Sequence, residues 1–200
     1  CIDMKERLDP RKMTWTKKPK LCIMTADKVI IETEPNSFVR DKSLGNGAFC
    51  LYADVEGNFM FEVKNEFDFH GEQDQCGVVL YKNPDNWSVC TIARINDAFS
   101  NLTCTVNYDG NKDTSIRRIG TGIHWLYHRI LYCNGNVRFQ AGFNNGEYRD
   151  LRIFRLFENS PSVKLMIYAC SPEKTYFDCT FSGMNIWHGL TEEQFKKGDI

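Results

Sequence analysis

Apolar and polar residues alternate one by one along much of the chain. Between residues 59 and 70 the odd positions are Phe59, Phe61, Val63, Asn65, Phe67 and Phe69, and the even positions are Met60, Glu62, Lys64, Glu66, Asp68 and His70. Side chains on a β-strand point alternately to opposite faces, so the pattern predicts a strand with one buried and one mostly polar face. A helix would spread the phenylalanines around its circumference.

The same alternation recurs in residues 102–108, 137–143 and 177–182. Beyond Gly183 the apolar parity shifts to Met184 and Ile186, which predicts a β-bulge at that glycine. Sequences typical of tight turns separate the runs, at residues 45–47, 83–86, 109–111, 134–136 and 144–146. About ten strands separated in this way favour a sandwich over a parallel α/β sheet.

We therefore predict an all-β fold, an antiparallel β-sandwich of the jelly-roll type, formed by one domain over residues 1–200. Residues 1–14 are expected to be an N-terminal arm, since basic residues there are interrupted by acidic residues and proline. The segment from Thr191 to Gln194 has the pattern of a capping box, which predicts a short helix in a C-terminal tail over residues 189–200.

Charge and cysteine usage narrow the possible partners. The 25 Lys and Arg residues nearly balance the 26 Asp and Glu residues, which argues against nucleic acid as the main partner. No apolar run approaches the ~18 residues that cross a bilayer, so no membrane span is expected. Most of the nine cysteines lie in apolar stretches and none forms a Cys-x-x-Cys motif. Such thiols persist most easily in a reducing compartment, so a cytoplasmic location is expected.

Several motifs resemble a known family. They are residues 54–59 (Asp-Val-Glu-Gly-Asn-Phe), Glu62-Val63-Lys64, residues 74–80 (Asp-Gln-Cys-Gly-Val-Val-Leu), Asn86-Trp87, and residues 169–172 (Ala-Cys-Ser-Pro). The chain resembles, over roughly residues 15–187, domain of unknown function family 1349. This family includes the "regulation of enolase" protein and relatives of the C-terminal domain of β-xylosidases. The resemblance implies a concanavalin A-like lectin/glucanase fold.

The chain departs from the family pattern at three positions. Val89 and Ala93 stand where the family usually has a lysine and a carboxylate, and Met166 stands where relatives tend to have glycine. If the missing polar groups line the family's pocket, the site of this chain is altered or inactive.

One candidate site combines aromatic, amide and charged residues on one concave sheet face. Its members are Tyr81, Trp87, Tyr127, Asp74, Gln75 and Arg94. Sugars stack their apolar faces on aromatic rings while carboxylates and amides bind the hydroxyl groups. The alternative is structural, with Tyr81 and Trp87 in the core and with Asp74 and Gln75 bonded to backbone groups at a strand start.

A second candidate is the carboxylate pair Glu66 and Asp68, which lie two positions apart on one predicted strand face, ~7 Å apart at Cα. A retaining glycoside hydrolase needs two such groups about 5–5.5 Å apart. A solvated strand face is the favoured explanation of the pair. His124 and His128 have the i, i+4 spacing of a helical metal pair. Their segment is more typical of a strand, however, and in a strand the two residues would be ~13 Å apart. No metal or cofactor is expected.

These observations favour a noncatalytic domain that binds carbohydrate or a sugar-derived metabolite and has a binding or regulatory role. Two alternatives remain: a glycoside hydrolase-like enzyme that uses Glu66 and Asp68, or Asp74, and a protein-interaction module with a protein partner.

Overall fold

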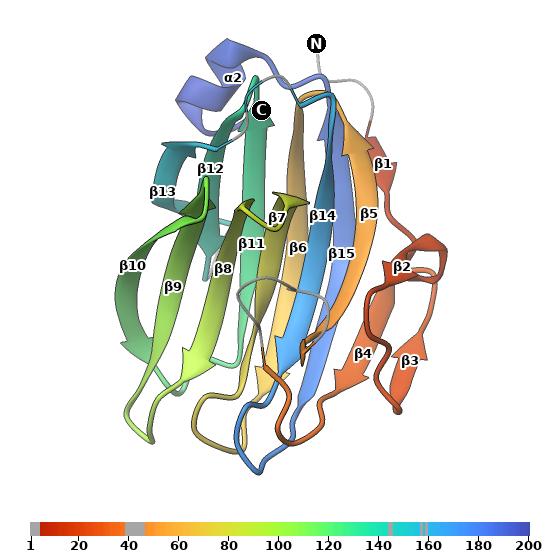
Figure 1. Cartoon of the computed structure of the whole chain (residues 1–200), viewed down its shortest axis with the longest axis vertical. Coiled ribbons are helices and arrows are strands. Elements are labelled where there is room, and N and C mark those ends of the chain that lie inside the picture. Colours follow the sequence, from red (N-terminus) through yellow and green to blue (C-terminus); the bar gives the residue numbers. More distant parts are fainter. Residues whose placement is uncertain (1–4, 39–46, 144–145, 157, 159) are drawn as a thin grey trace.

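The chain forms a sandwich of two antiparallel β-sheets, which confirms the predicted fold class (Figure 1). This computed structural model describes residues 5–38, 47–143, 146–156, 158 and 160–200. Alternate residues of each strand point into the space between the sheets, as the period-two pattern predicts. None of the helices formed by these residues is long and apolar enough to cross a membrane.

Sheet A has the order β13-β12-β11-β6-β15-β4-β3, with β1 paired to β15. Its strands are β1 (Lys5–Arg7), β3 (Cys22–Met24), β4 (Lys28–Glu32), β6 (Phe59–Asp68), β11 (Trp125–Cys133), β12 (Asn136–Gly142), β13 (Tyr148–Arg155) and β15 (Asp178–His188). Sheet B has the order β10-β9-β8-β7-β14-β5-β2. Its strands are β2 (Thr14–Trp15), β5 (Phe49–Glu56), β7 (Gln75–Asn83), β8 (Asn86–Arg94), β9 (Phe99–Tyr108), β10 (Asn111–Gly120) and β14 (Ser162–Cys170).

The main core lies between the two sheets and is rich in phenylalanine. Phe59, Phe61 and Val63 of β6 are fully buried, whereas Glu62 and Lys64, which have the opposite parity, lie on the outer face of sheet A. The strand predicted from the alternation over residues 59–70 is therefore confirmed, ending at Asp68.

Two of the predicted local features are present in detail. In the β9–β10 turn, Asp109 and Gly110 have φ values of 52° and 81°, the left-handed conformation that Asp-Gly favours. In β15 the pairing register shifts around Gly183, which has φ of 63°, and the inward-facing residues change from Phe181 to Met184. The predicted bulge is therefore confirmed. The turns expected at 45–47 and 144–146 fall largely outside the described residues.

The N-terminal segment is more than an arm. Cys1–Met4 lie outside the described residues, but β1 pairs with β15 of sheet A and β2 pairs with β5 of sheet B. A 3-10 helix, η1 (Pro10–Lys12), connects them. The side chains of β1 are exposed, so the sequence shows no burial pattern there, and its pairing comes from backbone hydrogen bonding to an available strand edge.

The C-terminal tail closes one end of the sandwich. Helix α2 (Glu192–Lys197) begins with the predicted capping box, because the Thr191 side chain accepts from the backbone N–H of Gln194 and the Gln194 side chain accepts from that of Thr191. Arg138 of β12 donates from Nη1 to the carbonyl oxygens of Phe195 and Lys196, at 2.9 Å each. The tail is thereby attached to sheet A (Figure 1).

Candidate ligand-binding face and side cleft

The outer face of sheet B, which points away from sheet A, carries a row of side chains in register across six strands. The row consists of Asp54, Lys164, Tyr81, Trp87, Asn107 and Lys112. Tyr52, Met166, Val79, Val89 and Thr105 form the next row. Residues that are directly opposite in antiparallel strands have adjacent side chains, so each row is a continuous strip of surface.

Lys164 organises one end of this face. Its Nζ lies 3.0 Å from Oδ1 of Asp54 and 4.3 Å from the centroid of the Tyr52 ring. The hydrogen bond that Lys164 donates to Asp54 raises the pKa of Lys164, since the carboxylate stabilises the ammonium form. Tyr52 and Tyr81 are both half-buried, and the Lys164 ammonium group covers part of the Tyr52 ring.

Trp87 is fixed in the face and contributes mainly to packing. It is only 3% exposed, and its Nε1 donates to the carbonyl oxygen of Pro84 at 3.1 Å. Asn107 Nδ2 donates to the same oxygen at 3.2 Å, so both side chains hold the β7–β8 turn. The ring packs in a second apolar cluster with Val79, Val89, Met166 and Tyr168, among others. The structure thus places Trp87 beside Tyr81, but with little ring surface free.

Gln75 lies on the same outer face and contacts Tyr168. The Tyr168 hydroxyl lies 3.4 Å from Oε1 of Gln75 and also contacts the Thr91 hydroxyl. Gly77 stands between Tyr168 and Thr91 in the register, so the missing side chain at Gly77 lets the tyrosine reach across the strand. A Cβ at Gly77 would also collide with the backbone of Cys90 and Thr91 in β8, which explains why a glycine occurs in the Asp-Gln-Cys-Gly motif.

Both departures of the β8 strand from the family pattern fall on this face. Val89 lies opposite Val79, and Ala93 lies opposite Gln75, each with 7% of its surface exposed. The positions at which the family resemblance predicts a lysine and a carboxylate are therefore apolar here, within the face that carries Tyr81 and Gln75.

Asp74 and Arg94 have structural partners instead. Asp74 is fully buried, and its Oδ2 accepts from the backbone N–H groups of His70 and Gly71 at 2.9 and 2.8 Å. Its Oδ1 accepts from the Thr175 hydroxyl at 2.5 Å. The Arg94 side chain pairs with Asp97, three residues away. The structural interpretation of Asp74, a carboxylate bonded to backbone groups before a strand, agrees with this geometry.

Tyr127 lies on the opposite side of the molecule. It belongs to β11 of sheet A, in register with Lys64 of β6, and its ring packs edge-on against Trp125 at 5.9 Å. The expectation that Tyr127 shares a face with Tyr81 is therefore wrong, because the two strands belong to different sheets.

Glu66 and Asp68 also lie on the outer face of sheet A. Lys64 Nζ lies 3.5 Å from Oε1 of Glu66, and the side chains of Glu66 and Asp68 are 46% and 79% exposed. His128 points into the core, while His124 precedes the strand. Among the residues that the structure describes, no three His, Cys, Asp or Glu side chains are grouped to hold a metal ion.

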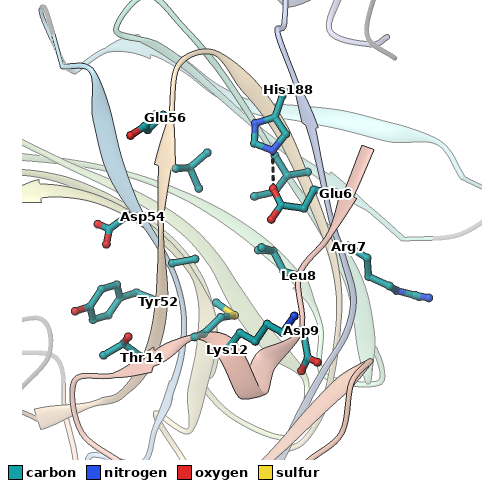
Figure 2. Close-up of a pocket in the computed structure, with 14 residues that line it drawn as sticks. Glu6, Arg7, Leu8, Asp9, Lys12, Thr14, Tyr52, Asp54, Glu56 and His188 are labelled. Carbon is teal, nitrogen blue, oxygen red and sulfur yellow. Dashed lines mark hydrogen bonds and ion pairs between the residues drawn. The ribbon is translucent and has the colours of Figure 1, made fainter. Parts of the chain in front are cut away.

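A cleft of about 590 Å³ opens along one side of the sandwich, between the N-terminal segment and β5 (Figure 2). Its rim carries Glu6, Asp9, Lys12, Asp54, Glu56 and His188, and its apolar lining includes Leu8, Met13, Val55 and Ile186. Nε2 of His188 lies 2.7 Å from Oε2 of Glu6. The sequence does not indicate this cleft, since its residues come from both ends of the chain. The one available signal was the Asp-Val-Glu alternation at 54–56.

Solved structures with similar folds come from varied proteins. A functionally unknown protein from Saccharomyces cerevisiae has a TM-score of 0.80 and 23% identity, with 92% of this chain and 100% of that chain covered. The GH43 BlXynB protein from Bacillus licheniformis has a TM-score of 0.66 and 10% identity, with 92% of this chain but only 38% of that chain covered.

The CBM2 module of the evolved Dit protein of Lactobacillus casei BL23 phage J-1 has a TM-score of 0.60 and 10% identity, with 94% of this chain and 97% of that chain covered. At these identities the likeness establishes the fold alone. No curated protein matches the sequence significantly.

The family is shown by the sequence itself. The model of one family matches residues 15–188, which include both sheets from β2 to the end of β15. The match contains all of the motifs on which the resemblance rests, from Asp54 to Pro172. The chain therefore belongs to the family described as protein of unknown function, DUF1349.

Proposed function

We propose that this protein is a noncatalytic carbohydrate-binding domain whose site is the outer face of sheet B. The observation that carries the proposal is the pair of half-buried rings, Tyr52 and Tyr81, with the ion pair of Asp54 and Lys164 next to them. Pyranose rings stack on exposed aromatic faces, and charged or amide groups beside the rings bind the hydroxyl groups.

The charges directly beside Tyr52 and Tyr81 favour a neutral sugar. Asp54 and Lys164 neutralise each other at 3.0 Å, and Gln75 adds an uncharged amide. Asp54, Lys164 and Gln75 together carry no net charge, so they would not attract an anionic uronate polymer. The presence of the fold in a GH43 protein and in a CBM2 module supports a role with carbohydrate, although it does so by analogy of fold.

The noncatalytic part of the proposal rests on how the carboxylates are engaged. A glycoside hydrolase needs a proton-donating acid and a second carboxylate on opposite sides of the scissile bond. Asp54 is bonded to Lys164. Glu66 lies beside Lys64 on the outer face of sheet A. The neighbouring side chain of Asp68 is largely exposed to solvent. Neither Glu66 nor Asp68 is near the aromatic face.

The test is a titration calorimetry series with neutral oligosaccharides, including xylo-, xyloglucan- and cello-oligosaccharides, and with an anionic uronate oligosaccharide. We expect saturable binding to one neutral class. Tyr81→Ala should weaken it by about tenfold, the value of one aromatic stacking contact of ~1.4 kcal/mol. The matched control is Tyr127→Ala, which removes a half-buried tyrosine from the opposite sheet.

Melting curves of each variant separate loss of binding from loss of folding. The proposal fails if no oligosaccharide binds, or if Tyr127→Ala weakens binding as much as Tyr81→Ala. The appearance of new reducing ends during incubation would contradict the noncatalytic part.

The thiols support a reducing compartment, so the proposed location is the cytoplasm. Cys76, Cys90, Cys104 and Cys179 are buried thiols in the structure, and Cys90 faces Cys104 across β8 and β9 without a disulfide. Alkylation in cells followed by mass spectrometry checks this, and disulfide-linked peptides would contradict it.

A further inference from the structure

Strand β5 has an edge that is only partly paired. One edge pairs with β14 along the whole of Phe49–Glu56, whereas β2 covers the other edge only at Leu51 and Tyr52. The backbone N–H of Thr16 donates to the carbonyl oxygen of Cys50, so even-numbered residues direct their main-chain groups to this second edge. The main-chain groups of Asp54 and Glu56 therefore face the side cleft without a strand partner among the described residues.

The side chains along this edge alternate in character. Val55 is 3% exposed and points into the core, and Ala53 has the same parity, whereas Asp54 and Glu56 point to the outer face. On the inner side, the cleft is lined by apolar groups continuous with the core, from Leu8, Met13 and Ile186.

Strand β2 shows how this edge accepts another strand. Thr14 lies opposite Tyr52 on the outer face, and Trp15 lies opposite Leu51 with its ring packed against the core. Before Thr14 the chain turns away into η1, which leaves the cleft open beside Asp54 and Glu56 (Figure 2). A second segment placed there antiparallel to β5 would repeat the arrangement of β2.

Four carboxylates line the cleft, those of Glu6, Asp9, Asp54 and Glu56. Three of them already have a basic partner: Glu6 lies beside His188, Asp9 beside Arg11, and Asp54 beside Lys164. The Arg7 side chain points away from the cleft (Figure 2), and its Nη2 lies 2.7 Å from Oδ1 of Asp27. Glu56 forms no ion pair with any described residue. A positively charged segment therefore complements the rim.

We propose that the side cleft binds an extended, basic segment of a partner protein as an added strand antiparallel to β5. Its residues alternate: the apolar side chains lie beside Ala53 and Val55 and contact the apolar lining, and the Lys or Arg side chains lie beside Asp54 and Glu56. The main chain of the basic residues bonds to that of Asp54 and Glu56. The cleft shares Tyr52 and Asp54 with the proposed sugar site but does not include Tyr81.

The probe is a fluorescein-labelled peptide of alternating lysine and valine, eight residues long, measured by fluorescence anisotropy. We expect saturable binding at a dissociation constant below about 1 mM, an affinity typical of weak edge recognition. A peptide of alternating glutamate and valine should not bind. N-methylation of the lysine amides, which face β5, should abolish binding, whereas N-methylation of the valine amides, which face away, should preserve it.

Two protein variants locate the site. Glu56→Lys should weaken binding by at least tenfold, and Asp68→Lys, which makes the same change of charge on the outer face of sheet A, should leave binding unchanged. Tyr81→Ala should also leave it unchanged, which distinguishes this proposal from the sugar site. Each variant is checked by its melting curve.

Three results would overturn the proposal. The first is no binding of the lysine–valine peptide up to 1 mM, about the weakest binding the assay resolves. The second is equal binding of both N-methylated peptides, because the edge of β5 would then not be used. The third is an equal loss in Glu56→Lys and Asp68→Lys, which would reveal unspecific attraction of charges.

Discussion

The side-chain amide of Asn65 lies 3.1 Å from Nε2 of His128, in the space between the two sheets. Both residues are almost fully buried, and the Asn65 amide also contacts the thiols of Cys76 and Cys179. No described residue bonds to Nδ1 of His128. Burial without a charged partner lowers the pKa of His128 to about 3, because the charged imidazolium loses its hydration there.

This burial makes His128 a source of acid sensitivity. The folded histidine stays neutral down to about pH 3, whereas the unfolded one takes up a proton near its ordinary pKa of 6.5. Between pH 6.5 and 3 the unfolded state binds more protons than the folded state. The contribution of the neutral His128 to the free energy of unfolding is therefore complete above pH 6.5 and is lost as the pH falls toward 3. One proton corresponds to a slope of at most ~1.4 kcal/mol per pH unit.

Urea unfolding at several pH values checks this. His128→Gln should have a shallower decline of the free energy of unfolding between pH 6.5 and 4 than the unmodified protein. Parallel profiles for the two proteins would show that His128 does not titrate in this way.

Gly77 should not tolerate a side chain. A Cβ at this position would lie 2.9 Å from the carbonyl carbon of Cys90, and the backbone of β8 cannot move aside without breaking its pairing. Gly77→Ala should lower the free energy of unfolding by about 3 kcal/mol or prevent folding, as overpacking does. Gly120→Ala in the edge strand β10 is the control, since nothing lies within 4 Å there. Similar urea midpoints for the two variants would contradict the prediction.

Asp74 should matter for stability more than for ligand binding. Asp74→Ala leaves the backbone N–H groups of His70 and Gly71 without their acceptor, so the free energy of unfolding should fall by about 2–4 kcal/mol. Asp68→Ala, an exposed carboxylate on the preceding strand, should change it by less than about 0.5 kcal/mol. Calorimetry on the milder Asp74→Asn separates the roles: an unchanged melting temperature with lost sugar binding would assign Asp74 to the ligand.

Arg138 should hold the C-terminal helix on the sheet. Its Nη2 lies 2.6 Å from Oδ2 of Asp150, and this contact holds the pKa of Asp150 below its ordinary value. Arg138→Ala removes the donors to the last carbonyl groups of α2 as well as this ion pair. We expect amide hydrogen exchange over residues 192–198 to become faster and the free energy of unfolding to fall by about 1–3 kcal/mol.

The control for this prediction is Arg155→Ala, because Arg155 is exposed and pairs only with the nearby Glu158 among the described residues. Equal exchange rates in the tail of the two variants would show that Arg138 does not anchor it.

Features decided by neighbouring residues were predictable from the sequence. The strand from Phe59, the turn at Asp109 and Gly110, the bulge at Gly183 and the cap at Thr191 all follow from local geometry. Each of these features depends on backbone conformation or side-chain direction within a few residues. The alternation of apolar and polar residues indicates that direction.

The candidate site was only partly predictable. The sequence indicated Tyr81, Trp87 and Gln75, which the structure brings onto one face, but it left open whether Trp87 is exposed to a ligand or buried, as it is in the structure. It gave no sign of Lys164 as the partner of Asp54, 110 residues away in the chain. Burial of an aromatic residue depends on what the remaining chain places around it, and a strand's own pattern does not contain that information.

Alternation along the chain was therefore sufficient for the long strands such as β6, for their inner and outer residues and for the all-β class. Only the tertiary structure decided which strands are neighbours, and with this the composition of the sites. It placed Tyr127 on the sheet opposite Tyr81, and it brought Glu6 within hydrogen-bonding distance of His188. The reason is physical: side-chain direction is a local property of the backbone, whereas strand pairing is a long-range choice that depends on the packing of the whole chain.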